Sequence, residues 1–562
     1  IGADWLNTEN NSSVERNSTG TTLNSQTSIN YIPIKNKRHT LTTMVLVEIN
    51  QDKDEFIETS TGNGPSAVIT DPASSPLRRN IKSGASVVNR VGVLTNIHYK
   101  FLDRHIFQIN MRNDASSRFG ENSRWGAFPS ASYAWRFSDE PFLSYLSFIE
   151  DSKLRVSYGL SGNSNVRAYD RHGLYDSNGS GQYMDISTIV PTQVQLQKLQ
   201  WETSTQLNLG LDISLFDYRL TFNAEYYDKI TDNILWKNYK LPSSSGYDKL
   251  RQFNDGKIQN TGYEISTRIV AIKKKDFTLG FNFNIYFNEN KFLEFPSNII
   301  DEETDISNGN YPVKAELGKP VGSFFGFKYL GVYPTAEDAV AKNEDGTVKL
   351  GPYGNPIPMN YNGTYEFTGG DAKYKDVNYD GIIDLDDVIY LGNSNPDFAG
   401  GFGMNISYKG FKFRSNFLYR YGYKVVNEIA LKAESMSNKN NQSKAVLNRW
   451  RVSGNDFPNM LPRAYRNHPA NNLGSDRYVE DASFIRLNNI SLNYTFNDRF
   501  VQSLGLKDLR VGVQVRKLLT FTNYSGQDPE VRLSQDDALW FARDKGKVPS
   551  PIITAFNVAV SF

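Results

Sequence analysis

Apolar and polar residues alternate along about fifteen segments of this chain. Residues 205–215 show the pattern clearly, because Leu207, Leu209 and Leu211 occupy every second position between polar neighbours. Only an extended strand places every second side chain on one face. The expected strands are 21–34, 39–50, 85–100, 104–112, 126–137, 153–160, 205–215, 218–226, 260–271, 276–290, 398–408, 411–421, 483–496, 508–521 and 552–562.

The face opposite the apolar one is too polar for a packed core. In 411–421, Phe413 and Phe417 share a face, whereas Lys412, Arg414 and Arg420 share the other. Burying three cations in the core of a β-sandwich would cost a large free energy, but a wet lumen accommodates them. We therefore predict an all-β fold, a transmembrane antiparallel β-barrel with lipid outside and water inside.

Short and long connections between these segments alternate along the chain. Outer-membrane barrels have short periplasmic turns and longer extracellular loops. The longest connection, 291–397, is therefore expected to be a long extracellular loop. Helical pieces are expected within the long connections, near 335–342 and 425–450. Strand 483–496 changes parity near Asn488 and Asn489, which predicts either a β-bulge or a strand end that lies beyond the lipid. The odd strand count, and a first strand that starts from the outer surface, predict further strands before residue 1.

The composition excludes some classes of function but does not identify one. The chain has 562 residues, a formal charge of +1, no cysteine and 13% aromatic residues. The near-neutral charge gives no reason to expect a nucleic-acid partner. No run of 18 apolar residues suggests a transmembrane helix, while the mean hydropathy of −0.51 is compatible with alternating barrel strands.

The long loop contains one motif typical of a metal site. Residues 376–387 (DVNYDGIIDLDD) match the first half of an EF-hand calcium loop. The expected ion is a structural Ca²⁺. Position 12 is an aspartate where glutamate is usual, and this shorter carboxylate can bind through a single oxygen, so weaker Ca²⁺ binding or Mg²⁺ is the alternative. A polar turn without an ion remains the competing interpretation. The candidate ligands are Asp376, Asn378, Asp380, Ile382 through its carbonyl, Asp384 and Asp387.

The sequence contains no catalytic motif that we recognise, so we expect that the protein is not an enzyme. It contains no H-E-x-x-H, no P-loop, no G-x-S-x-G and no cysteine nucleophile. Aromatic residues of the long connections could stack on sugars, although packing between loops is the simpler role; they are Tyr311, Tyr353, Tyr361, Tyr365 and Trp540. No substrate-binding residue can be assigned.

Several stretches, in order along nearly the whole chain, resemble the SusC/RagA class of TonB-dependent outer-membrane transporters. The most specific is 376–387 followed by 392–398 (GNSNPDF). The other matching stretches are 113–120 (NDASSRFG), 124–130 (RWGAFPS), 154–159 (LRVSYG), 201–203 (WET), 260–264 (NTGYE), 321–326 (VGSFFG), 479–487 (VEDASFIRL) and 526–530 (GQDPE).

This resemblance implies a fold and a set of partners. The family barrel has 22 strands and an N-terminal plug, so residues 1–562 would be its C-terminal part, with about fifteen strands, no plug and no TonB box. The implied function is TonB-dependent import of oligosaccharides or oligopeptides across the outer membrane. The implied partners are a SusD-like surface lipoprotein, TonB acting through the plug region, outer-membrane lipid, and a second transporter–lipoprotein pair in a dimer.

Two other classes share parts of the pattern. A passive porin would show the same alternation, but it does not need large structured loops. A secreted β-rich adhesin or glycan-binding protein would also be rich in strands. The inward-facing Lys412, Arg414 and Arg420 argue against the secreted protein.

Overall fold

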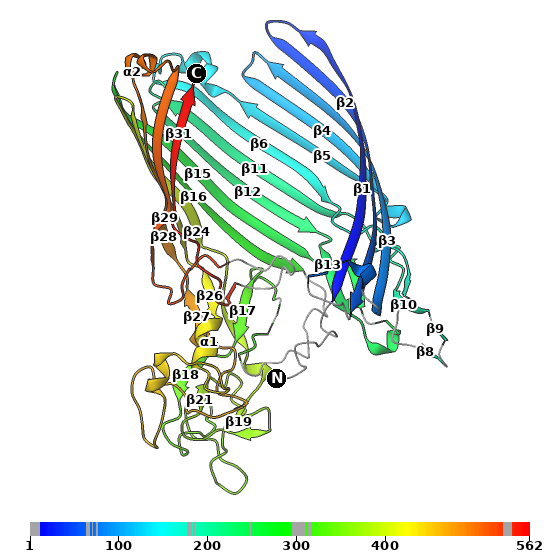
Figure 1. Ribbon diagram of the computed structural model, residues 1–562, viewed down its shortest axis with the longest axis vertical. Coiled ribbons are helices and arrows are strands. Elements are labelled where there is room, and N and C mark those ends of the chain that lie inside the picture. The colour runs from blue at the N-terminus through cyan, green and yellow to red at the C-terminus, as the bar shows by residue number, and fades with distance from the viewer. Residues whose placement is uncertain are drawn as a thin grey trace. The chain divides into compact units, whose positions relative to one another are not determined.

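The computed structural model describes most of the chain and is dominated by one antiparallel sheet (Figure 1). The described residues are 12–62, 68–69, 71–74, 77–176, 182–183, 186–187, 189–247, 249–294, 309–312, 314, 316–531 and 542–562. Fifteen strands follow one another in the sheet in the order β1-β2-β3-β4-β5-β6-β11-β12-β15-β16-β24-β25-β28-β29-β31. Consecutive long strands are therefore neighbours, as in a meander.

The fifteen long strands have these bounds: β1 Ser13–Lys35, β2 His39–Gly62, β3 Leu77–Phe101, β4 His105–Ser116, β5 Trp125–Trp135, β6 Ile149–Asn163, β11 Glu202–Leu215, β12 Leu220–Asp232, β15 Lys257–Lys273, β16 Phe277–Glu294, β24 Phe398–Tyr408, β25 Phe411–Tyr421, β28 Phe484–Thr495, β29 Asp508–Thr522 and β31 Ile553–Ser561. The remaining strands are short and lie in the connections: β7 Leu174–Asp176, β8 Gln182–Tyr183, β9 Ile186–Ser187, β10 Val190–Gln193, β13 Leu235–Lys240, β14 Lys249–Asn254, β17 Ser323–Gly326, β18 Tyr329–Val332, β19 Asn360–Tyr361, β20 Tyr365–Glu366, β21 Ala372–Tyr374, β22 Ile382–Ile383, β23 Ile389–Asn393, β26 Lys424–Asn427, β27 Val479–Asp481 and β30 Arg543–Asp544. The helices are α1 Glu428–Glu434 and α2 Asp498–Ser503.

Each of the fifteen expected segments forms one strand of the main sheet. The predicted cores of β1, β2 and β3 were too short, because these strands continue through polar stretches such as 13–20 and 51–62. The hydrogen-bonded ladder thus extends beyond the alternating apolar region. The sequence pattern reports where apolar side chains are needed, not where backbone pairing ends.

The pairing register between neighbouring strands shows which residues share a face of the sheet. Residues directly opposite each other in an antiparallel pair point to the same face. One such row is apolar across six strands and consists of Leu279, Ile406, Phe413, Leu492, Val513 and Phe556. The adjacent row consists of Gly280, Asn405, Arg414, Ser491, Gln514 and Ala555. The predicted division into an apolar and a polar face is confirmed.

Tight turns and β-bulges set the register of the sheet. Leu102 and Asp103, and likewise Phe216 and Asp217, have positive φ, which is typical of the type I′ turns that join two strands of a hairpin. The predicted bulge is also present, because the pairing of β28 with β25 and β29 shifts between Leu487 and Asn489. Asn488 is therefore the extra residue that changes the parity of β28.

Contact density divides the chain into two units, each of which holds part of the sheet. The first contains 1–140, 154–209 and 229–257, and the second contains 141–153, 210–228 and 258–562. In the second unit, β17, β18, β19, β21 and α1 gather beyond one end of the long strands, and α2 and the C-terminus lie at the other end (Figure 1). Long connections thus share one end of these strands.

The alternation of connection lengths has one exception. Connection 117–124 lies in the series of long connections, yet it is shorter than 136–148 in the opposite series. Connection 291–397 begins a few residues later than predicted, because β16 extends to Glu294.

The prediction of a helix near 335–342 was wrong. Val340 and Lys342 instead form isolated bridges with Pro358 and Val348. Part of the second expected helical region forms α1. None of the helices in the described ranges is long and apolar enough to cross a membrane.

The largest buried cluster lies in the connections, not between layers of sheet. It joins residues of connection 295–397 to residues of connection 422–483 and comprises Phe327, Tyr333, Ala339, Ala341, Met359, Tyr361, Phe367, Ala372, Tyr374, Ile383, Ala470 and Leu473. The two longest connections therefore fold together around a common hydrophobic core.

Candidate functional site

The first half of the metal-like loop adopts the turns that its sequence predicts. Asp376 Oδ2 accepts a hydrogen bond from the Gly381 amide at 2.8 Å, and Asn378 Oδ1 accepts one from the Asp380 amide at 3.1 Å. Asp380 Oδ1 accepts from the Ile382 amide at 2.7 Å. Gly381 has φ +92°, a conformation in which glycine is strongly favoured. Asp376, Asn378 and Asp380 thus curve around one turn.

The second half of the loop closes back on the first. Asp387 Oδ1 accepts from the Val377 amide at 2.6 Å, and its Oδ2 accepts from the Asp384 amide at 3.1 Å. Asp384 caps the short 3₁₀ turn 385–387. Ile382 begins β22, which pairs in parallel with β19. The Asp387 carboxylate thus joins the two halves of the loop through the amides of Val377 and Asp384, while its role as a metal ligand stays a prediction.

Two carboxylates of this loop are held away from water. Asp387 is fully buried, and burial, together with the nearby Asp376 and Asp384, raises its pKa to about 6. Burial is also the main cause that raises the pKa of Asp376. Asp376 Oδ1 is buried and has no hydrogen-bond partner in the described part of the chain.

The donor set fits a hard cation that prefers oxygen ligands. Among the described residues, no three His, Cys, Asp or Glu side chains lie close enough together to hold a metal ion by themselves. A site here would therefore also use the amide oxygen of Asn378 and the carbonyl of Ile382, as the calcium-loop pattern requires.

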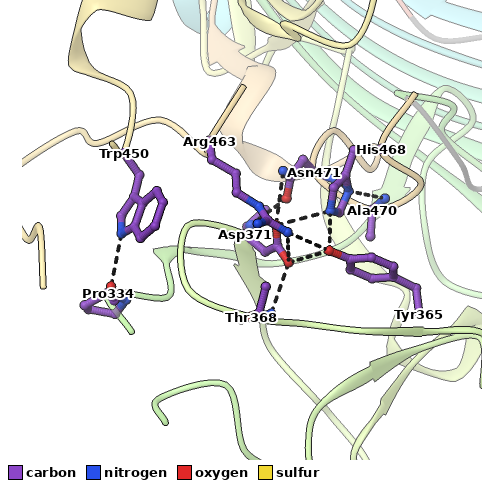
Figure 2. A network of polar contacts seen from close by, with 10 residues as sticks. Pro334, Tyr365, Thr368, Asp371, Trp450, Arg463, His468, Ala470 and Asn471 are labelled. Atoms are coloured by element: carbon purple, nitrogen blue, oxygen red, sulfur yellow. Dashed lines mark hydrogen bonds and ion pairs between the residues drawn. The ribbon is translucent and has the colours of Figure 1, made fainter. Parts of the chain in front are cut away.

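A second polar centre, not anticipated from the sequence, joins the two longest connections. Asp371 lies at its middle, fully buried, and is surrounded by Arg463, His468 and Tyr365 (Figure 2). Arg463 Nε donates to Asp371 Oδ1 at 2.8 Å, and the Tyr365 hydroxyl donates to Asp371 Oδ2 at 2.8 Å. His468 Nε2 lies 3.1 Å from Asp371 Oδ1 and 2.8 Å from the Tyr365 hydroxyl.

Backbone contacts fix the tautomer of His468. Its Nδ1 accepts hydrogen bonds from the amides of Ala470 and Asn471, both at 3.1 Å. Nδ1 is therefore unprotonated, and the proton lies on Nε2, facing Asp371. Burial opposes ionisation of Asp371, yet hydrogen bonds from His468 and Tyr365 and the charge of Arg463 hold its pKa below the ordinary value. The centre is a paired, satisfied network that holds two loops together.

A third contact attaches connection 523–552 to the polar face of the sheet. Arg486 of β28 is almost fully buried and donates to Asp528 Oδ1 at 2.6 Å and to Glu530 Oε2 at 2.7 Å. Arg420 of β25 lies 3.6 Å from Glu530 Oε1. The segment 526–530, one of the stretches singled out in the sequence, is therefore held against the wall by paired charges.

The aromatic residues of the loops take different roles. Tyr311 and Tyr361 are buried in loop cores, which is the packing role that we favoured. Tyr365 belongs to the network around Asp371. Tyr353 is 96% exposed in a turn. Trp540 lies outside the described residues. No spacing rule connects Asp371 with Arg463 and His468, so their contact could not be predicted from the sequence.

Comparison with known proteins agrees with this architecture. The family model described as TonB dependent receptor-like, beta-barrel, matches residues 2–516. TonB-dependent receptor P39 of Formosa agariphila is 32% identical over 489 residues, covering 83% of this chain and 46% of that protein. TonB-dependent receptor SusC of Bacteroides thetaiotaomicron is 28% identical over 499 residues, covering 84% of this chain and 44% of that protein. The chain thus spans about half the length of the curated relatives it matches.

A solved structure shares the fold. The RagAB peptide transporter superimposes with a TM-score of 0.79 at 21% sequence identity, covering 98% of this chain and 56% of that one. Together with the fifteen-stranded sheet and its two faces, these matches show that the chain belongs to the TonB-dependent receptor-like β-barrel family of the bacterial outer membrane.

Proposed function

We propose that the chain is part of an energised importer that takes oligosaccharides or oligopeptides across the outer membrane together with a SusD-like surface lipoprotein. The observation that carries this proposal is the shared core of connections 295–397 and 422–483, with its buried network around Asp371. Loops that only connect strands do not need a core of their own, whereas binding loops and lids often have one. The names of the relatives, SusC and the RagAB peptide transporter, support the same function.

The proposed assembly has further members. TonB would act through a plug region, and the lipoprotein would cover the long loops. Two transporter–lipoprotein pairs would associate as a dimer. Because the apolar row of the sheet includes Phe556, which is 82% exposed, lipid is the expected neighbour of that face.

An energised importer and a passive porin can be separated by leakage and by energy dependence. Liposomes that contain the full-length protein are expected to swell in raffinose no faster than protein-free liposomes, because a plugged transporter stays closed without TonB. Growth of the source bacterium on an oligosaccharide or peptide mixture that requires this protein is expected to stop when TonB is deleted. Rapid swelling, or growth that continues without TonB, would favour the porin.

We propose further that residues 376–387 bind Ca²⁺ as a structural ion, with Mg²⁺ as the weaker alternative. The proposal is supported by the fully buried Asp387, by the buried and unpartnered Asp376 Oδ1, and by the calcium-loop turns that Asn378 and Asp380 form. The cation would offset the repulsion between these carboxylates and tie the turn to the loop core through β22.

Calcium is expected to stabilise the loop measurably. At a Ca²⁺ concentration of 100 times Kd, ligand linkage predicts about 2.7 kcal/mol of stabilisation, which raises the unfolding temperature of the full-length protein. Asp376→Asn should abolish this Ca²⁺-dependent shift. Asp386→Asn, an exposed neighbour outside the ligand pattern, should preserve it. An identical Ca²⁺ response in both variants, or none in the wild type, would show that the turn works without an ion.

A further inference from the structure

The apolar face of the sheet carries an aromatic row where the strands approach their short turns. This row lies one two-residue step, about 7 Å, beyond the apolar row that includes Phe413. Its members lie opposite one another in register and are Phe277 of β16, Tyr408 of β24, Phe411 of β25 and Tyr494 of β28. Tyr408 is 48% exposed and Phe411 is 47% exposed. Aromatic belts of this kind mark the edge of the hydrocarbon layer around outer-membrane barrels.

Two neighbouring turns lie just beyond the aromatic row, and both contain lysine. The turn between β15 and β16 contains Lys274, Lys275 and Asp276, and the turn between β24 and β25 contains Lys409. The Lys409 amide donates a hydrogen bond to the Asp276 carbonyl at 3.1 Å, so the two turns are in direct contact. All three lysines are exposed, and Asp276 is the one carboxylate in these two turns. We call Lys274, Lys275 and Lys409 the turn lysines.

Two observations place turn lysines on the lipid side of the wall. The Lys274 amide donates to the Phe277 carbonyl at 2.8 Å, and the Phe277 amide donates to the Lys274 carbonyl at 3.4 Å. Residues that exchange two hydrogen bonds in this way point to the same face, so Lys274 extends the aromatic row. Lys409 Nζ lies 5.4 Å from the centre of the Tyr408 ring, which belongs to that row. A plug inside the barrel would contact the opposite face of the wall and leave these side chains uncovered.

The depth of the turn lysines matches that of the lipid headgroups. Lys409 is one residue beyond Tyr408, a step of about 3.4 Å along the strand. The polar layer of a bilayer extends about 5–7 Å beyond the hydrocarbon on each side. A lysine lays its methylene groups along apolar surface and holds its ammonium group in the polar layer. Lipid phosphates therefore lie within reach of the turn lysines.

We propose that the turn lysines bind the phosphate of an anionic glycerophospholipid in the periplasmic leaflet, with its acyl chains packed on the aromatic row. The short turns of outer-membrane barrels face the periplasm, which assigns the leaflet. Three ammonium groups beside one carboxylate favour a lipid with a net negative charge over a zwitterionic lipid, whose own ammonium group they repel. The bound lipid would hold the barrel at a fixed height in the membrane. This inference goes beyond the import function and does not depend on it.

Thermal unfolding of the delipidated full-length protein in detergent tests the inference. Phosphatidylglycerol is expected to raise the unfolding temperature at lower concentration than phosphatidylethanolamine does, and its apparent affinity should fall as salt is added. The variant K274Q/K275Q/K409Q should weaken phosphatidylglycerol binding about tenfold or more, because each lysine near the membrane surface adds attraction to an anionic lipid. The variant K274R/K275R/K409R should retain most of the binding, since it keeps the three charges.

A matched control removes the same charge elsewhere. Lys342, Lys439 and Lys444 are exposed lysines of the long connections, so K342Q/K439Q/K444Q should bind phosphatidylglycerol as the wild type does. An equal loss in this control would mean that net charge, and not the site, attracts the lipid, and would overturn the proposal.

Three further results would also overturn it. They are equal wild-type affinities for the two lipids, unchanged phosphatidylglycerol binding in the glutamine variant, and an equal rise in unfolding temperature with inorganic phosphate, which would indicate a site for a free anion. If the glutamine variant does not fold, the wild-type comparison of the two lipids and its salt dependence still decide. None of these results changes the outcome of the raffinose and TonB experiments.

Discussion

Replacing Asp371 with alanine is expected to destabilise the paired loops by about 3–5 kcal/mol, the usual cost of removing one partner from a buried ion pair. The change leaves Arg463, the Tyr365 hydroxyl and His468 Nε2 without the acceptor that they share. Hydrogen exchange of 365–374 and 463–473 in the full-length protein measures the loss. Asp345→Ala, at an exposed turn of the same connection, should leave the exchange of these two segments unchanged. Equal exchange in both variants would contradict the assigned role.

The same network predicts how the loops respond to acid. The pKa of Asp371 in the folded protein lies below its ordinary value, so its contribution to stability is complete above about pH 4 and is lost as the pH falls through the folded pKa. The wild type should therefore lose loop protection on acidification below pH 4 more steeply than Asp371→Asn. Parallel pH profiles would mean that the carboxylate is not the sensitive group.

Placing a charge on the apolar face should have the second large effect. Leu209 is 44% exposed in β11, on the face expected to meet lipid. Leu209→Arg is expected to destabilise the folded protein by about 2–4 kcal/mol if this position lies near the bilayer midplane. Gln206→Arg, on the polar face beside Asn208, should be tolerated. Heat-modifiable gel migration and urea unfolding in lipid vesicles compare the two, and equal effects would mean that the faces are assigned wrongly.

Sequence reasoning succeeded where a local rule applies. Alternation located all fifteen strands, and the parity change at Asn488 located the bulge, because both depend on neighbouring residues. The turns of 376–387 also form as expected, since short-range hydrogen bonds from Asp376, Asn378 and Asp380 define them. The ion itself stays a prediction.

The structure of the long connections could not be predicted by the same local rules. The segment 335–342 has apolar residues at spacings that suit a helix, yet Ala339 and Ala341 are buried in a core shared with Ala470 and Leu473. That core depends on partners more than a hundred residues away, which no local period reports. The contact of Asp371 with Arg463 and His468 was missed for the same reason.

The bulge at Asn488 reverses the alternation of side chains along β28, so that odd and even positions exchange faces on its two sides. Before it, Arg486 faces the carboxylates of 528–530, and after it, Ser491 lies beside Arg414 on that same side. Deleting this one residue would restore strict parity and rotate one half of the strand by half a turn, so that either the guanidinium or the serine row would face acyl chains. Insertions or deletions in β28 should therefore be tolerated only in pairs of residues, or together with a matching change on β29 near Lys517. Lys517 has a positive φ and lies where the pairing of β29 with β28 is irregular.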